Sequence, residues 1–294
     1  MQEEYFKHLL KNKAFLLKVS LFFAIFGLVV SLFLNNYFRA SSIIVPTRDN
    51  YQNENSSQIG AIAQSIGFGA DDATPELKFA LSYFNSYKFI SEFIASEDIL
   101  PEILFFKGYN RKKDSISFSV DPDEYRIKAL FDDQEVNYSS KLFQDAVKEF
   151  RKFVILTPGR ENDPAMYLSV THRSPSFAYR LNKKILLFLN EAIINIDIKD
   201  SDSKLDYIKS IIPSYDEVEV RKVLSKIIEK ELTKKILANS VSEYSFMILD
   251  PPVLPIEKYS PRRTILILTF MLSGLLAAII YQTFTFAKNR KEKI

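Results

Sequence analysis

The chain of 294 residues has no cysteine, no tryptophan, seven glycines and two histidines. The lack of cysteine excludes disulfide bonds, thiol nucleophiles and metal sites built on thiolates. His8 and His172 are too far apart in the sequence to form a metal-binding pair with a short spacing, and we expect solvated or structural roles for both. The sequence also lacks the Gly-x-x-x-x-Gly-Lys-Ser/Thr motif of phosphate-binding loops. We therefore expect no cofactor, no metal ion and no nucleotide hydrolysis by this chain itself.

Two long apolar runs lie near the two ends of the chain. Residues 14–38 form the first run, in which Lys18 is the only charged residue, and residues 264–287 form the second, which has none. As a helix, the second run is roughly 36 Å long, enough to cross a hydrocarbon core about 30 Å thick. Each run is predicted to be a transmembrane helix.

A cleaved signal peptide is the alternative interpretation of the first run. Lysines precede it, and Ala40-Ser41-Ser42 offers a small-x-small cleavage site. However, the uncharged part, residues 19–34, is longer than the usual apolar segment of a signal peptide. Asn35, Asn36 and Arg39 are typical of the end of an anchor. These features favour a membrane anchor.

Basic residues flank both runs on the side of the chain termini. They are Lys7, Lys11, Lys13 and Lys18 at the first run, and Lys288, Arg290, Lys291 and Lys293 at the second. The positive-inside rule predicts that both tails, residues 1–13 and 288–294, are cytoplasmic, so that residues 39–263 form an extracytoplasmic domain. This middle segment is close to neutral, and the formal net charge of +3 comes from the tails. The charge therefore does not indicate nucleic-acid binding.

The middle segment contains the patterns of both strands and helices. Strands are predicted at residues 40–46, 115–120, 153–157, 166–171 and 244–249. Helices are predicted at 74–95 and 140–152, where apolar residues recur every three or four positions. Pro46 stops the first strand, which we therefore place at a sheet edge. The predicted fold class is α+β, with strands from both ends of the segment in one sheet.

Residues 174–240 have the longest helical pattern. Ser174 suits an N-cap and Pro175 a first turn, while Pro213 interrupts the periodicity. Two long helices that fold back on each other, away from the sheet, are therefore predicted. Apolar residues at helical spacing form either the seam of this hairpin or a contact between subunits; they include Leu181, Ile185, Phe188, Val220, Leu224 and Ile227.

A proline-rich collar, residues 250–263, joins the last predicted strand to the second apolar run. Its prolines cannot continue a helix, so an extended segment is predicted. The collar carries Asp250, Pro252, Pro255, Ser260, Pro261 and Arg262. This motif, together with two terminal spans around an α+β base and a long helical excursion, resembles the Wzz chain-length determinants, the polysaccharide co-polymerase family. The resemblance extends along nearly the whole chain.

The resemblance implies a non-enzymatic, two-pass protein of the bacterial inner membrane. It implies a ring-like homo-oligomer that acts with a Wzy-type polymerase on a growing polysaccharide and sets the chain length of lipopolysaccharide O-antigen or a similar polymer. The alternative is an adaptor for capsule or exopolysaccharide export, with or without a separate tyrosine kinase. A membrane-anchored sensor and an envelope hydrolase are further alternatives. The short tails disfavour the sensor, and acidic pairs such as Asp121 and Asp123 are common in turns, which disfavours the hydrolase.

The second span departs from the family pattern. The family usually has a dense glycine cluster there, whereas this chain keeps only Ser273, Gly274, Ala277 and Ala278. These residues form two small-x-x-x-small pairs, which allow close helix packing in lipid. We expect them to contact the first span or a neighbouring subunit. The chain also lacks the cytoplasmic tyrosine-kinase domain that is fused to some relatives.

Overall fold

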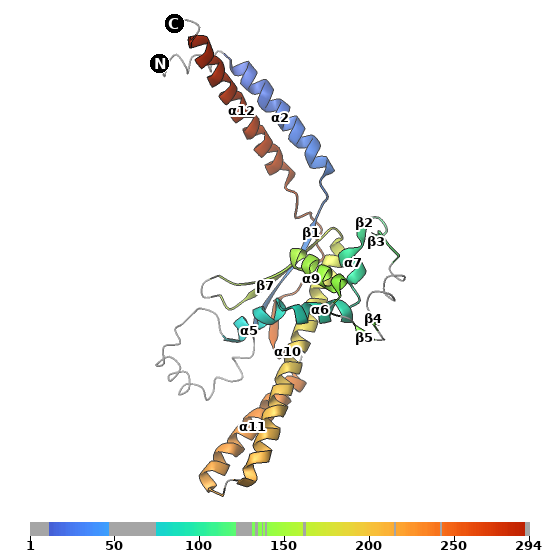
Figure 1. Ribbon diagram of the computed structural model, residues 1–294, viewed down its shortest axis with the longest axis vertical. Coiled ribbons are helices and arrows are strands. Elements are labelled where there is room, and N and C mark those ends of the chain that lie inside the picture. The colour runs from blue at the N-terminus through green and yellow to red at the C-terminus, as the bar shows by residue number, and fades with distance from the viewer. Residues whose placement is uncertain are drawn as a thin grey trace. The chain divides into compact units, whose positions relative to one another are not determined.

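A computed structural model of the chain describes residues 12–46, 75–121, 131–132, 135–136, 138, 140–160, 163–214, 216–241 and 243–291 (Figure 1). The chain divides into two units. The terminal unit comprises Met1–Phe38 and Ile256–Ile294, and the central unit comprises Arg39–Pro255. The helix predicted for residues 74–95 is described from Pro75 onward, and His8 and Asp123, named above, lie outside the described residues.

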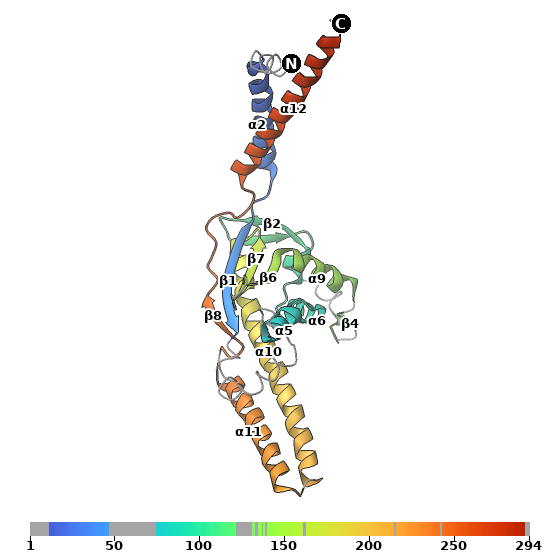
Figure 2. The ribbon, with the colours of Figure 1, turned by 90° about the vertical axis from the view of Figure 1, so that its left-hand side faces the viewer.

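The terminal unit contains the helices α2 (Lys13–Phe33) and α12 (Arg263–Lys291), which lie side by side (Figures 1 and 2). Both are long and apolar enough to cross a membrane, with mean hydropathies of 2.4 and 2.3. Helix α2 ends at Phe33, earlier than the apolar run predicts, and Leu34 is already extended. The two asparagines that follow are poor helix formers, and Tyr37 pairs with Ser260 instead of continuing the helix.

The central unit is built on one four-stranded sheet with the strand order β6-β7-β1-β8. The strands are β1 (Phe38–Pro46), β6 (Val154–Pro158), β7 (Met166–His172) and β8 (Phe246–Asp250). Strands β1 and β8 are antiparallel, and Ile44 lies opposite Ile248. This pairing confirms that strands from both ends of the segment share one sheet.

Strand β1 lies inside the sheet, so its predicted place at an edge is wrong. Pro46 is the last residue of β1, where a missing N–H costs little, and the proline therefore does not force the strand to an edge. The other strands form small hairpins: β2 (Phe106–Asn110) with β3 (Ser115–Phe118), and β4 (Phe131–Asp132) with β5 (Glu135–Val136).

The helices of the base are α5 (Pro75–Phe84), α6 (Tyr87–Ser96), α7 (Leu100–Leu104) and α9 (Lys141–Phe153). The single helix predicted for residues 74–95 is therefore two helices. The Ser86 hydroxyl accepts a hydrogen bond from the Phe89 N–H at 3.1 Å, so Ser86 is an N-cap that starts a new helix. Helix α9 follows its prediction: Ser140 is its N-cap, and the predicted apolar face is buried.

The hydrophobic core lies on one face of the sheet, where α5, α6 and α9 gather (Figure 2). Along β1 and β7 alternate residues are buried, as in Ala40, Ile44, Leu168 and Val170, because successive side chains point to opposite faces. Phenylalanines dominate the helical side of this core. The ring centroids of Phe93 are 5.9 Å from Phe150 and 5.3 Å from Phe188, in edge-to-face geometry. The structure thus confirms the α+β class.

Helix α10 (Pro175–Ile211) crosses the core and extends beyond it, and a 3-10 turn (Ile212–Ser214) connects it to α11 (Val218–Ser240) (Figure 1). The Ser174 hydroxyl accepts a hydrogen bond from the Phe177 N–H at 3.2 Å, as expected of an N-cap. Pro213 lies in the connecting turn. Two long helices that fold back on each other are therefore confirmed, and we call this pair the hairpin.

Asn182 fixes α10 to the sheet. Its side chain is fully buried, its Nδ2 donates to the carbonyl oxygen of Ala40 at 3.1 Å, and its Oδ1 accepts from the Ser42 hydroxyl at 2.8 Å. A further, longer bond of 3.4 Å reaches the carbonyl oxygen of Leu168 in β7. One amide therefore joins the helix to two neighbouring strands.

We expect Asn182→Ala to lower the stability of the central unit, because it leaves buried polar groups of β1 without their partner. Each such group costs about 1–3 kcal/mol, which corresponds to a fall in the unfolding midpoint of roughly 2–12 °C for a unit of this size. Thermal unfolding of the full chain in detergent, followed by far-UV circular dichroism, measures this fall. Asn239→Ala is the control, since Asn239 is exposed and bonds only within α11. Equal midpoints for the two variants would contradict the role of Asn182.

Candidate functional site

Two glycines interlock the helices of the terminal unit. A Cβ atom on Gly27 would lie 2.8 Å from the Cβ of Phe270, and a Cβ on Gly274 would lie 2.6 Å from the Cβ of Phe23. Each phenylalanine precedes the glycine of its own helix by four residues, so each helix contributes one Phe-x-x-x-Gly segment. The aromatic ring of one segment occupies the space over the glycine of the other.

Polar side chains also join the two helices. The Ser20 hydroxyl donates to the carbonyl oxygen of Met271 at 3.1 Å, and the Asn12 amide donates to Oε1 of Gln282 at 3.1 Å. Both Ser20 and Gln282 are buried between the helices. The small residues of the first apolar run were not predicted to pack against the second span. They are Ser20, Gly27 and Ser31, and their helical spacing is visible in the sequence.

The four small residues singled out in the second span fall on two faces of α12. Gly274 and Ala278 are buried, whereas Ser273 and Ala277 are exposed. Only the pair of Gly274 and Ala278 therefore faces inward in the terminal unit. A contact of the exposed pair with a neighbouring subunit stays a prediction.

The collar is extended between Asp250 and the start of α12, without a helix or a strand. Asp250 is the last residue of β8 and lies opposite Ile43. Pro252 and Pro255 are half-buried, and Arg262 is exposed. No interaction of these residues indicates a binding role.

The last part of the collar pairs with the chain that leaves α2. The Tyr37 N–H donates to the carbonyl oxygen of Ser260 at 2.8 Å, and the Tyr259 N–H donates to the carbonyl oxygen of Tyr37 at 2.8 Å. Pro261 follows directly, and its peptide bond with Ser260 is cis. Arg263 at the start of α12 donates to Asn36 Oδ1 at 3.4 Å. The ends of the two apolar helices are thus joined by main-chain hydrogen bonds.

The residues predicted for the seam of the hairpin do not come together. Leu181 and Ile185 belong to the core of the base, and Phe188 packs its ring 5.4 Å from that of Phe89. The reason is that the first half of α10 lies on the sheet and only the second half faces α11. On α11, Val220 and Leu224 are half-buried, whereas Ile227 is 40% exposed.

The second half of α10 buries the apolar residues Leu205 and Ile208, and the seam of the hairpin also contains charged residues. Lys234 Nζ lies 3.5 Å from Asp197 Oδ1, and both side chains are largely buried. The Ser201 hydroxyl donates to Glu231 Oε2 at 2.8 Å, and Lys204 Nζ lies 3.9 Å from the other oxygen of Glu231. The polar residues of each helix recur at helical spacing. The seam was nevertheless predicted from apolar residues alone, so these polar residues were not predicted.

Charge in this seam is paired across and along the helices. Lys204 Nζ lies 2.6 Å from Asp200 Oδ2, and this hydrogen bond raises the pKa of Lys204. Lys235 Nζ lies 2.6 Å from Asp202 Oδ1 in a pair that is exposed to solvent by more than a third of each side chain. A buried ion pair specifies which faces of the two helices pack together, although its net contribution to the free energy of unfolding is small.

His172 has a structural place at the end of β7. Its Nδ1 accepts a hydrogen bond from the Ser174 N–H at 3.1 Å, and its ring lies 4.5 Å from that of Phe106. Burial lowers the pKa of His172 to about 4, so the ring is neutral at pH 7. Within the described part of the chain, no group of three or more His, Asp or Glu side chains is arranged to hold a metal ion.

We expect Gly274→Leu to separate α2 from α12. The new side chain meets the Cβ of Phe23, which no side-chain rotation can move, and such overpacking costs about 1–3 kcal/mol. Oxidative cross-linking of an Asn12→Cys, Gln282→Cys pair reports the contact, because the native side chains are hydrogen-bonded. We expect the cross-linked fraction to fall several-fold. Ala277→Leu is the matched control on the exposed face, and an equal effect of both variants would contradict the interlocked packing.

We expect Asp197→Asn to loosen the hairpin, because the Lys234 charge then stays buried with only the more distant Asp200 beside it. Removing one partner of a buried pair costs about 3 kcal/mol, which corresponds to roughly 100-fold faster amide exchange in α11. Hydrogen–deuterium exchange measures this rate. Asp202→Asn breaks the more exposed pair with Lys235 and should cost less than about 1 kcal/mol. Unchanged protection of α11 in Asp197→Asn would show that the buried pair does not hold the hairpin.

No family model and no curated protein matches the sequence. Among solved structures, the chain is similar to a full-length bacterial polysaccharide co-polymerase, with 12% identity, 97% of each chain covered and a TM-score of 0.37. It is also similar to a fragment of WzzB, a polysaccharide co-polymerase from Salmonella Typhimurium, with 12% identity, 76% of this chain and 100% of that chain covered, and a TM-score of 0.31.

A third similar structure is a mutant of the Shigella flexneri lipopolysaccharide O-antigen chain-length regulator WzzBSF. It is 11% identical, the match covers 76% of this chain and 99% of that chain, and the TM-score is 0.21. With TM-scores below 0.5, these likenesses do not by themselves establish a shared fold. Their descriptions name the family that this chain resembles in its sequence motifs.

Proposed function

We propose that this chain is a polysaccharide co-polymerase of the bacterial inner membrane, which sets the chain length of a surface polysaccharide as the partner of a Wzy-type polymerase. The observation that carries the proposal is the combination of the collar motif with a base whose first and last strands, β1 and β8, follow and precede the two apolar helices. The proposed polymer is lipopolysaccharide O-antigen or a similar polysaccharide. The chain performs no catalytic step in this proposal, and the polymerase makes the bonds.

The proposed orientation has both termini in the cytoplasm and the central unit in the periplasm. The lysines and arginines beside the outer ends of the two apolar runs support this orientation, since basic residues are retained on the cytoplasmic side. The central unit, with the hairpin, would then face the polymer as it grows.

The proposed assembly is a ring-like homo-oligomer. Apolar side chains on α11 support it, because they are exposed; they are Val218, Val223, Ile227, Leu232 and Ile236. Exposed apolar surface of this kind is typical of contacts between proteins. In the proposed assembly, α11 contacts a neighbouring subunit.

We expect Ile227→Asp to weaken the oligomer and to shift the polysaccharide toward shorter or unregulated lengths. Ile227 is 40% exposed, so the charge can stay in contact with solvent in a single chain but should oppose burial against a neighbour. The measurements are the banding pattern of the polysaccharide on a gel, in a strain that carries only the variant, and chemical cross-linking of the protein in membranes.

Thr233→Asp is the control, because it adds the same charge on the exposed polar face of α11. We expect its product lengths to equal those of the unchanged protein. Complete loss of polymer at normal protein levels in Ile227→Asp would indicate a catalytic or export role. An unchanged length distribution would show that this face of the hairpin does not regulate length.

A further inference from the structure

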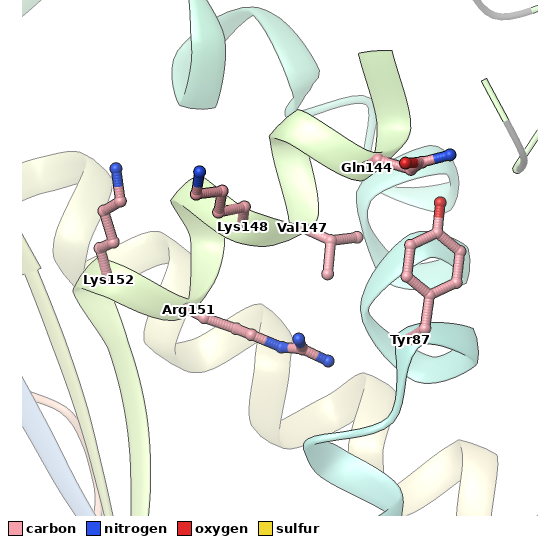
Figure 3. A pocket seen from close by; sticks show the side chains of 6 residues that line it. All are labelled: Tyr87, Gln144, Val147, Lys148, Arg151 and Lys152. Carbon is pink, nitrogen blue, oxygen red and sulfur yellow. The ribbon is translucent and has the colours of Figure 1, made fainter. Parts of the chain in front are cut away.

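A basic pocket of about 660 Å³ lies between the start of α6 and the second half of α9 (Figure 3). Its volume is in the range of pockets that bind small molecules. The residues that line it are Tyr87, Gln144, Val147, Lys148, Arg151 and Lys152. Three of these six carry a positive charge and none is acidic. The pocket therefore differs from the central unit as a whole, whose charge is close to neutral.

A hydrogen bond to the main chain fixes the Arg151 side chain. Its Nη2 donates to the carbonyl oxygen of Asn85 at 2.8 Å. That residue lies at the break between α5 and α6, just before the N-cap Ser86. A guanidinium group has five N–H donors in one plane, and the bond to Asn85 uses one of them. The other donors can bind an oxyanion through two parallel hydrogen bonds, as in arginine–carboxylate and arginine–phosphate contacts.

The positive charge of the pocket is carried mainly by Lys148 and Arg151. Lys152 pairs with Glu149 on the same helix, so its charge is largely balanced there. Asp145 also lies on α9, one turn before Lys148, and reduces the net positive charge of this helix without lining the pocket. In Figure 3, the Arg151 guanidinium points toward Tyr87, and the Lys148 ammonium group lies on the other side of the same helix turn.

The remaining lining residues suit a ring with hydroxyl groups. Val147 lines the pocket but is only 2% exposed, so Tyr87 and Gln144 offer the accessible surface for a ring. Tyr87 contributes an aromatic ring, and its hydroxyl donates to the carbonyl oxygen of Tyr138, so the ring is fixed. Gln144 offers an amide with both donor and acceptor atoms. Apolar contacts for a sugar ring and polar groups for its hydroxyls are thus present beside the two cations.

We propose that this pocket binds a saccharide unit that carries an oxyanion, either a carboxylate or a phosphate. Arg151 binds the anionic group, Lys148 adds positive charge on the other side of the same helix turn, and Tyr87 and Gln144 contact the ring. The inference rests on the proposed function only for the source of the saccharide, which would be the polymer or its building blocks. The pocket itself is argued from its side chains.

The test is ligand binding to the full chain in lipid nanodiscs, measured by saturation-transfer NMR. The observed probes are glucuronate, glucose 1-phosphate and glucose, and inorganic phosphate serves as the competitor. We expect saturable signals from one or both of the anionic sugars, competition by excess phosphate, and no signal from glucose. Stronger binding of glucuronate would assign the anion as a carboxylate, and stronger binding of glucose 1-phosphate would assign it as a phosphate.

Arg151→Gln should weaken the binding about tenfold, because it removes a charged hydrogen-bond donor, and Lys148→Gln should weaken it measurably but less, because it removes only a neighbouring positive charge. Lys141→Gln is the matched control: this exposed lysine lies on the same helix but does not line the pocket. Since Arg151 also contacts the corner before α6, Lys148→Gln keeps the test valid if Arg151→Gln does not fold.

Several results would overturn the proposal: equal signals from glucose and the anionic sugars, anionic-sugar signals that excess phosphate does not reduce, or an equal loss in Lys141→Gln. The outcome is separate from that of the proposed function. A chain that fails to bind these probes but still loses length control in Ile227→Asp would remain a chain-length regulator without this pocket. If the chain binds these probes but Ile227→Asp leaves the polysaccharide lengths unchanged, the pocket is supported and the proposed role of the hairpin is contradicted.

Discussion

Contacts between the two ends of the chain organise both units. In the terminal unit, the Tyr37–Ser260 bridge joins the exits of the apolar helices, and the interlocked Phe-x-x-x-Gly segments pack α2 against α12. In the central unit, β1 pairs with β8. The intervening chain is therefore a closed loop whose first and last strands are neighbours, and the helices of the base pack on the face of the sheet that this pairing creates. Without the pairing, β8 would have no place in the sheet and α10 would lose part of the surface that it covers.

The hairpin buries charged residues in addition to apolar ones such as Leu205 and Ile208. Helix pairs usually bury apolar residues between them and expose charge. Here Asp197 and Lys234 lie in the seam, while Val223 and Ile236 on α11 are exposed. A paired but buried charge adds little net stability, whereas an incorrect register would leave it unpaired at high cost, so the polar seam specifies how the helices align. The exposed apolar residues remain available for another surface, which fits the proposal that α11 contacts a second subunit.

The break between α5 and α6 links the fold to the proposed ligand pocket. A continuous helix through residues 85 and 86 would use the Asn85 carbonyl within its own hydrogen-bond ladder. Because Ser86 starts a new helix, that carbonyl accepts from Arg151 instead, and Tyr87 begins α6 beside α9. A local capping choice thus positions two of the residues that line the pocket.

The sequence alone determined the local features of this protein. The two apolar runs, the N-caps at Ser140 and Ser174, the apolar face of α9 and the extended collar all follow from residue type and spacing over a few turns, and the structure has each of them. The tertiary structure decided which faces meet. Ile185 and Ile227 both belong to apolar patterns of long helices, yet the first is fully buried in the core and the second is exposed, because only the first half of α10 reaches the sheet. The place of β1 inside the sheet, the polar seam and the reciprocal packing of Gly27 and Gly274 likewise depend on partners that are far away in the sequence. A periodicity shows that a helix or strand has a face, but the free energy of burying that face depends on the surface opposite, which no local pattern contains.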